Sequence, residues 1–164
     1  MSARETNGAA GQHHGRRDRP VPGRPPVPAR LPAPGKPPAP GRHARSYDVR
    51  GLTVIELRGA IDLSNVPEIR ALADAVTARP GVRVVMDLRP VEFLDGSTLG
   101  LLCRTRRRAL DQGGHLTLVC VRPWHLRILR AAGLGTVFAP FATLEAALEA
   151  TLGAASGTPP PHGG

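Results

Sequence analysis

The stretch that decides the fold is VRVVMDLRPVEFLDGSTLGLL, residues 82–102. It begins with Val82–Leu88, an apolar run that only Arg83 interrupts before the run reaches Asp87. Such a run is typical of a central strand that is buried on both faces of a sheet. A shorter extended element at Val91–Leu94 follows directly. The first half of the stretch therefore predicts sheet.

The second half of the stretch predicts a helix. Asp95-Gly96-Ser97 is a turn signal, and the helix is expected over Thr98–Gln112, where Gly113-Gly114 ends it. Helical spacing indicates that one side of this helix faces the core, through Leu99, Leu102, Cys103 and Leu110. Most of the arginines of this helix would then point outward.

Upstream, the sequence predicts a hairpin followed by a helix. Ser46–Arg50 and Leu52–Arg58 are two β-like runs around Gly51. In the second run Ile55 and Leu57 would face one side of the sheet, and Leu52, Val54 and Glu56 the other. The following helix can be capped by Ser64 or Asn65, has Pro67 in its first turn and stops at Pro80-Gly81.

Downstream, strands and helices continue to alternate. The expected elements are a strand at His115–Val121, a helix at Pro123–Ala132, a short strand at Thr136–Phe138 and an amphipathic helix at Leu144–Leu152. The whole order is typical of an α/β domain. We expect a mixed sheet of about four to six strands, the later ones parallel, with about four helices packed against it.

The ends of the chain differ in composition from its middle. Residues 1–45 carry nine Lys and Arg against two Asp and Glu, whereas residues 46–164 carry thirteen against eleven. Residues 20–41 are so rich in proline that an extended spacer is expected. The sequence thus predicts a disordered Pro/Arg-rich tail over 1–45, one domain over 46–153 and a disordered tail over 154–164.

Several classes of protein are disfavoured by composition. The first residues lack the apolar run of a signal peptide, and no stretch is long enough to span a bilayer, so a cytoplasmic protein with no membrane partner is expected. The basic tail leaves nucleic-acid binding open, but aromatic residues that could stack on bases are few, so nucleic acid is not the expected partner. Both Cys103 and Cys120 lie in apolar runs and are expected to be buried.

Catalytic and metal-binding motifs are also missing. The sequence contains no GxSxG, HExxH, P-loop or GxGxxG pattern, so we expect neither an enzyme nor a cofactor. Asp62, Asp87 and Asp95 each follow an apolar run, which places them at the carboxyl ends of strands. Together they could hold Mg²⁺, but aspartate also caps helices and starts turns, and we expect no metal site.

The turn FLDGSTLGLL, residues 93–102, is the most informative part for function. A helix N-terminus presents free backbone N–H groups and partial positive charge, so a phosphate on a serine there would be stabilised. A phosphate would also change how this edge meets a partner. The alternative is that Ser97 or Asp95 only caps the helix.

Three segments, taken in order, resemble a STAS domain of the anti-sigma factor antagonist family. They are the Gly59-x-x-Asp62 step, the block from Asp87-Leu88 through Phe93-Leu94-Asp95 to Leu99-Gly100, and the segment from Pro123 through Gly133-Leu134 to Val137-Phe138. The resemblance covers about residues 46–152. It implies a STAS-like mixed sheet and a bacterial regulator that binds an anti-sigma factor, often a serine kinase, and so releases a sigma factor.

The resemblance also implies a switch, and this sequence departs from it. Family members usually read D-S-[ST]-G-L-G, and the kinase phosphorylates the serine after the aspartate; a phosphatase reverses this. Here the acceptor position is Gly96, while Ser97 and Thr98 follow it. Either phosphorylation has moved to Ser97 or Thr98, or the protein binds its partner without a switch.

The residues and the resemblance together lead to two functional hypotheses that share one fold. The first is an anti-sigma factor antagonist-like protein that influences sigma-factor-dependent transcription by binding a kinase-type anti-sigma factor. Its expected partner-binding residues are Asp62, Asp95, Gly96, Ser97, Arg104, Arg107 and Arg108. The second is a STAS interaction module in another assembly, a stress complex or a lipid-transport system, without a phosphorylation switch.

Overall fold

The computed structural model describes residues 41–155. The predicted tails, 1–45 and 154–164, therefore lie almost entirely outside the described residues. Within that range the elements are β1 (Ala44–Val49), β2 (Leu52–Leu57), β3 (Gly59–Ile61), α1 (Val66–Thr77), β4 (Arg83–Asp87), β5 (Val91–Leu94), α2 (Gly96–Asp111), β6 (His115–Val119), α3 (Pro123–Ala131), α4 (Gly135–Phe138) and α5 (Leu144–Ala155). None of the described helices is both long and apolar enough to cross a membrane.

Four strands form a mixed sheet in the order β1-β2-β4-β6. β1 and β2 are the predicted antiparallel hairpin, whereas β4 runs parallel to both β2 and β6. The hairpin turns through Arg50 and Gly51, both with positive φ, which is the backbone of a two-residue type I′ turn. β3 and β5 pair in parallel as a separate two-stranded sheet.

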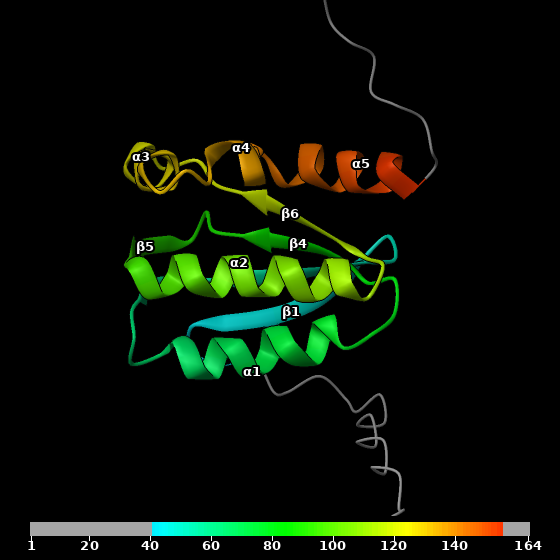
Figure 1. Cartoon of the computed structure of the whole chain (residues 1–164), viewed down its shortest axis with the longest axis horizontal. Helices are drawn as coiled ribbons and strands as arrows, with labels where there is room; N and C mark the ends of the chain where they lie inside the picture. The colour runs from blue at the N-terminus through cyan, green and yellow to red at the C-terminus, as the bar shows by residue number, and fades with distance from the viewer. Residues whose placement is uncertain (1–40, 156–164) are drawn as a thin grey trace, which may run out of the picture. The chain divides into compact units, whose positions relative to one another are not determined.

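Helices cover both faces of the four-stranded sheet. Figure 1 shows α1 and α2 side by side on one face and α5 on the other. The larger core lies under α1 and α2 and includes Ile55 and Leu57, whereas Leu52 and Val54 belong to the smaller core with Leu148 of α5. The predicted alternation of these strand residues is therefore confirmed, and so is the predicted mixed α/β fold.

Three local predictions are wrong. Thr136–Phe138 is not a strand but part of the single helical turn α4, and β3 was not foreseen as a strand of its own. Cys103 and Leu110 do not face the core, because the buried stripe of α2 runs through Thr98, Leu101, Leu102, Thr105 and Ala109. Two residues of this buried stripe, Thr98 and Thr105, are threonines, whereas the prediction had counted only apolar residues as facing the core. Cys120 is buried as expected.

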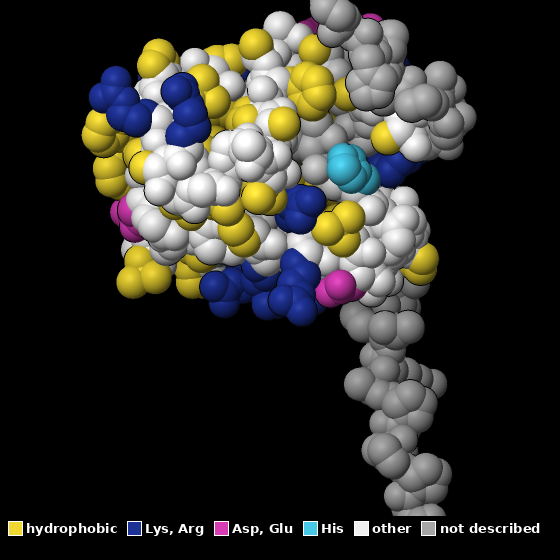
Figure 2. Space-filling view, turned by 45° about the horizontal axis from the view of Figure 1, so that its top comes forward, with side chains coloured by type: hydrophobic (Ala, Val, Ile, Leu, Met, Phe, Trp, Pro, Cys, Tyr) yellow, Lys and Arg dark blue, Asp and Glu magenta, His cyan; other side chains and the backbone are white. Residues whose placement is uncertain are grey.

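Backbone packing explains one of the predicted helix ends. After α2, Gly113 has positive φ, and Gly114 lies so close to β4 that an added Cβ would collide with the carbonyl oxygen of Val82. Only glycine therefore fits at Gly114 without a backbone shift. Figure 2 turns α3, α4 and α5 toward the viewer, and on this face hydrophobic and basic side chains outnumber acidic ones.

Candidate functional site

The candidate site lies where β3 and β5 end. The last residues of these parallel strands, Ile61 and Leu94, are register partners, so Asp62 and Asp95 leave the small sheet side by side. The two carboxylates are close enough for the charge of Asp95 to act on the pKa of Asp62. We call this edge, with residues 62–65 and 93–97, the rim.

Asp95 is held in place as the N-cap of α2. Its backbone is extended, and its Oδ1 accepts hydrogen bonds from the backbone N–H of Ser97 (2.9 Å) and Thr98 (3.3 Å). The Ser97 hydroxyl donates to the same oxygen. The hydrogen bonds, led by that of Ser97, hold the pKa of Asp95 below its ordinary value, so the carboxylate is ionised at neutral pH.

Asp62 organises the neighbouring loop in a similar way. Its Oδ1 accepts hydrogen bonds from the Ser64 backbone N–H (2.9 Å) and hydroxyl (2.5 Å), and these lower the pKa of Asp62. Asn65 ties the loop together, because its amide donates to the Ala60 carbonyl and accepts from the Asp62 N–H. The rim therefore presents two ionised carboxylates on a hydrogen-bonded frame.

The three residues after Asp95 differ sharply in access. Gly96 is exposed, and a Cβ added to it would meet no heavy atom within 4 Å. Ser97 is half-buried with its hydroxyl on Asp95. Thr98 is fully buried, and its hydroxyl donates to the Ile61 carbonyl (3.3 Å), which ties α2 to β3. Of the two predicted phosphorylation candidates, only Ser97 is accessible from solvent.

Two large apolar side chains at the rim were missed by the sequence analysis. Leu63 is 74% exposed and Phe93 is 51% exposed. Phe93 points outward because β5 has one residue more than β3 in this register: Gly59 pairs with Val91, but Ala60 pairs with Phe93. This β-bulge leaves Glu92 and Phe93 both exposed between buried neighbours. No short sequence motif predicts such a bulge.

The predicted arginines of α2 are divided between two roles. Arg104 and Arg108 both form ion pairs with Asp74 of α1, at 3.0 and 3.1 Å, and Arg108 also donates to Thr77 Oγ1. These two side chains therefore join α1 to α2. Arg107 is exposed and makes no ion pair within residues 41–155, so it is the predicted arginine that is free to meet a partner.

The third strand-end carboxylate does not join the rim. Asp87 is buried, and its two oxygens accept hydrogen bonds from the Arg89 guanidinium at 2.8–3.2 Å. An ion pair of this kind neutralises a charge that would otherwise be costly to bury. Across the described part of the chain, no three His, Cys, Asp or Glu side chains come together in a way that could hold a metal ion.

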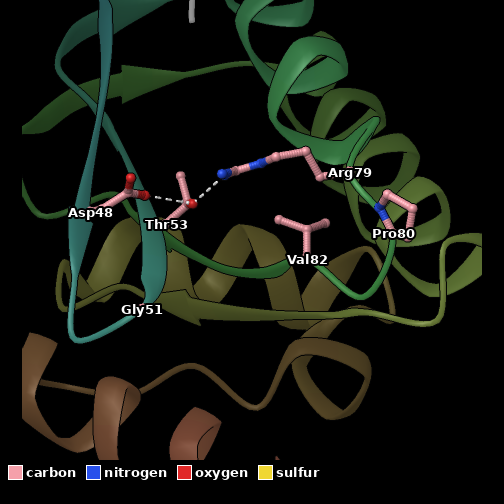
Figure 3. Close-up of a pocket in the computed structure, with 6 residues that line it drawn as sticks. All are labelled: Asp48, Gly51, Thr53, Arg79, Pro80 and Val82. Carbon is pink, nitrogen blue, oxygen red and sulfur yellow. Dashed lines mark hydrogen bonds between the residues drawn. The ribbon is translucent and has the colours of Figure 1, made fainter. Parts of the chain in front are cut away.

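A polar hollow of about 280 Å³ lies at the other end of the strands, beside the β1–β2 turn. Figure 3 shows the Thr53 hydroxyl between Asp48 and Arg79. It donates to Asp48 Oδ1 (2.8 Å) and accepts from Arg79 Nη2 (2.5 Å). These polar groups already bind one another, so the hollow offers little to a ligand and the rim remains the candidate site.

Comparison with known proteins defines the class to which this fold and rim belong. The family model described as "Mlab, STAS domain" matches residues 49–151, and the chain belongs to the STAS domain family. The prediction of this family from the three sequence segments is thereby confirmed.

Individual relatives carry regulatory names. An anti-sigma F factor antagonist from Paenibacillus polymyxa is 28% identical over 86 residues, which are 52% of this chain and 74% of the relative. A solved anti-sigma factor antagonist from Mycobacterium paratuberculosis is 29% identical, with a TM-score of 0.61 over 66% of this chain and 92% of its own. The antagonist SpoIIAA in its unphosphorylated form is 26% identical, with a TM-score of 0.57 over 67% of this chain and 96% of its own.

Proposed function

We propose that this protein is an anti-sigma factor antagonist that binds a kinase-type anti-sigma factor through the rim and thereby influences sigma-factor-dependent transcription. Family membership and the names of the relatives support the general role. The proposed partner implies that the protein works in the cytoplasm, by binding and without catalysis of its own.

The observation that carries the proposal is the chemistry of the rim. Leu63 and Phe93 expose apolar surface beside the ionised carboxylates of Asp62 and Asp95. An exposed aromatic side chain surrounded by fixed polar groups is the usual composition of an interface centre. The first turn of α2 and the exposed Arg107 extend this surface along the helix.

We further propose that binding is not switched by phosphorylation. The family acceptor position is Gly96, which has no hydroxyl. Ser97 is one residue further, and one residue turns a side chain by about 100° around a helix. Its hydroxyl is also engaged with Asp95, and the Thr98 hydroxyl is buried. A kinase partner would then be held without being able to release itself, and no phosphatase would be needed.

Isothermal titration calorimetry of the full chain with purified kinase-type anti-sigma factors tests this function. Phe93→Ser is expected to weaken binding by about 30-fold, the effect of losing an interface centre worth about 2 kcal/mol. Val137→Ser is the matched control, because Val137 is a comparably exposed apolar residue (44%) on α4, outside both the rim and α2. Absence of binding to every such factor by a chain with a folded circular dichroism spectrum would refute the proposal.

A second candidate function keeps the fold and the rim but changes the assembly. The missing acceptor at Gly96 favours a STAS module in another complex, such as a stress complex or a lipid-transport system. Neighbouring genes distinguish the two. A sigma factor or a histidine-kinase-like ATPase beside this gene favours the first candidate, and genes for transport or stress-complex subunits favour the second.

A further inference from the structure

A second surface, separate in composition from the rim, is formed by α3. From Gln112 to Leu144 the sequence contains no Asp or Glu. Over the same range it carries Arg122, Arg127 and Arg130, and none of these makes an ion pair with any residue between 41 and 155. The surface therefore has three uncompensated positive charges on or next to one short helix.

An exposed tryptophan lies in the middle of these charges. Trp124 is 58% exposed, and the Arg127 guanidinium lies 5.8 Å from the centre of its ring. Residues three apart lie on the same side of a helix, so Trp124, Arg127 and Arg130 form one stripe along α3. In Figure 2, dark blue and yellow side chains lie next to one another in this region.

An apolar cavity opens beside the stripe. It has a volume of about 230 Å³ and lies between α3 and α4, lined by Leu126, Leu129, Arg130, Gly135, Thr136 and Pro140. Arg130 thus belongs both to the stripe and to the wall of the cavity. Cofactor and drug-sized ligand sites usually have volumes of about 300–1,000 Å³. This cavity is smaller and fits a single apolar side chain.

We propose that α3 and this cavity form a docking site for an acidic segment of a protein partner, with one apolar side chain of that segment in the cavity. Three arginines that form no ion pair with any residue between 41 and 155 select for carboxylates, because the guanidinium matches the geometry of a carboxylate. Trp124 and Arg are the residue types most enriched at interface centres. A discrete cavity favours a peptide side chain over a lipid surface, which would contact the helix without needing a cavity. The inference does not depend on the rim.

Trp124 is the only tryptophan of the chain, so its fluorescence reports on this surface alone. The full chain is titrated with the blocked peptide Glu-Glu-Leu-Glu-Glu, and we expect a saturable change in emission that weakens as salt is raised. Glu-Glu-Ser-Glu-Glu should bind at least about fivefold more weakly because it lacks the apolar anchor. Lys-Lys-Leu-Lys-Lys should not bind.

Charge-reversal variants test whether the peptide binds at α3. Arg127→Glu and Arg130→Glu should each weaken binding of the leucine peptide by at least about fivefold. Arg70→Glu makes the same change of charge at an exposed position on α1 and should leave binding unchanged. Circular dichroism confirms that each variant is folded. If Arg70→Glu weakened peptide binding equally, the loss of affinity would be due to the change in net charge of the protein. That result would overturn the assignment of the binding site to α3.

Other occupants give distinct results. Vesicles of phosphatidylglycerol that shift the Trp124 emission, while the leucine peptide does not, would mean that the surface binds anionic lipid. A dimer in sedimentation analysis that Arg127→Glu dissociates would mean that a second copy covers it. Either result, or no response to the leucine peptide at low salt, overturns the proposal.

Discussion

Replacing Gly96 by serine should give this protein the phosphorylation switch that its resemblance to the motif D-S-[ST]-G-L-G implies. Gly96 is the first residue of α2, and its backbone is not in the left-handed region. Since an added Cβ meets no heavy atom within 4 Å, the serine side chain fits without displacing a neighbour. Glycine is a poorer helix former than serine by about 0.5 kcal/mol, so the free energy of unfolding should rise by no more than that amount.

Phosphorylation of the new serine should change the affinity for the partner by much more than the substitution changes stability. A phosphate at position 96 adds about 1.5 to 2 negative charges beside the ionised carboxylate of Asp95. The partial positive charge at the N-terminus of α2 would favour that phosphate on the rim, while the Ser97 and Thr98 N–H groups remain hydrogen-bonded to Asp95. A partner that approaches the carboxylates and Phe93 would then meet a strongly anionic surface. We expect its affinity to fall by at least about tenfold, or 1.4 kcal/mol.

The assay compares the natural chain with G96S. Each is incubated with ATP and a kinase-type anti-sigma factor that binds the natural chain, and the peptide that spans Asp95 is analysed by mass spectrometry. Only G96S should gain a phosphoryl group, and only phosphorylated G96S should lose binding in calorimetry. Phosphate on Ser97 of the natural chain would refute the reasoning. So would an unlabelled G96S in the presence of a kinase that labels a control antagonist with the usual motif.

Three further predictions concern stability, each measured by urea unfolding. Thr98→Val should cost about 1–2 kcal/mol, because the buried hydroxyl no longer donates to the Ile61 carbonyl; an unchanged midpoint would contradict this role. Gly114→Ala should lower the free energy of unfolding by about 1–3 kcal/mol, because the added Cβ collides with the Val82 carbonyl oxygen. An unchanged free energy of unfolding would contradict this close packing. Burial lowers the pKa of His125, so the unfolded chain binds more protons in acid, and stability should fall as the pH drops below about 6.5. His125→Leu should reduce that slope between pH 7 and pH 5, and an identical slope would contradict the assignment.

Periodicity predicted most of the fold because the strands and helices bury regular patterns. Alternation in Leu52–Leu57 and the apolar run before Asp87 correspond to strands whose inward positions are aliphatic. The prediction of secondary structure is wrong where tertiary packing, and not periodicity, determines the conformation. Val137 and Phe138 have high strand propensity, but Phe138 reaches the core from a helical turn that ends at Ala139 in the left-handed region. Tertiary packing overrides local propensity there.

The site was predicted only in part, for a similar reason. Aspartates that follow strands are visible in sequence, and two of the three, Asp62 and Asp95, do meet at the rim. Asp87 does not, because Arg89 neutralises it inside the fold. Nothing local in the sequence shows that Arg104 and Arg108 have their partner thirty and thirty-four residues earlier, at Asp74. Ion pairs between helices are long-range contacts, which neither spacing nor composition reveals.

Because of the bulge in β5, the direction in which Phe93 points depends on the number of residues in that strand. Glu92 is the additional residue, and its backbone lies next to the buried ring of His125 in the first turn of α3. If Glu92 were deleted, Val91 and Phe93 would become consecutive, and β3 and β5 would pair residue by residue without a bulge. The ring of Phe93 would then no longer be turned to solvent by the bulge. Deletion of a single codon is therefore enough to remove the exposed aromatic ring from this surface, with every side chain of the motif unchanged.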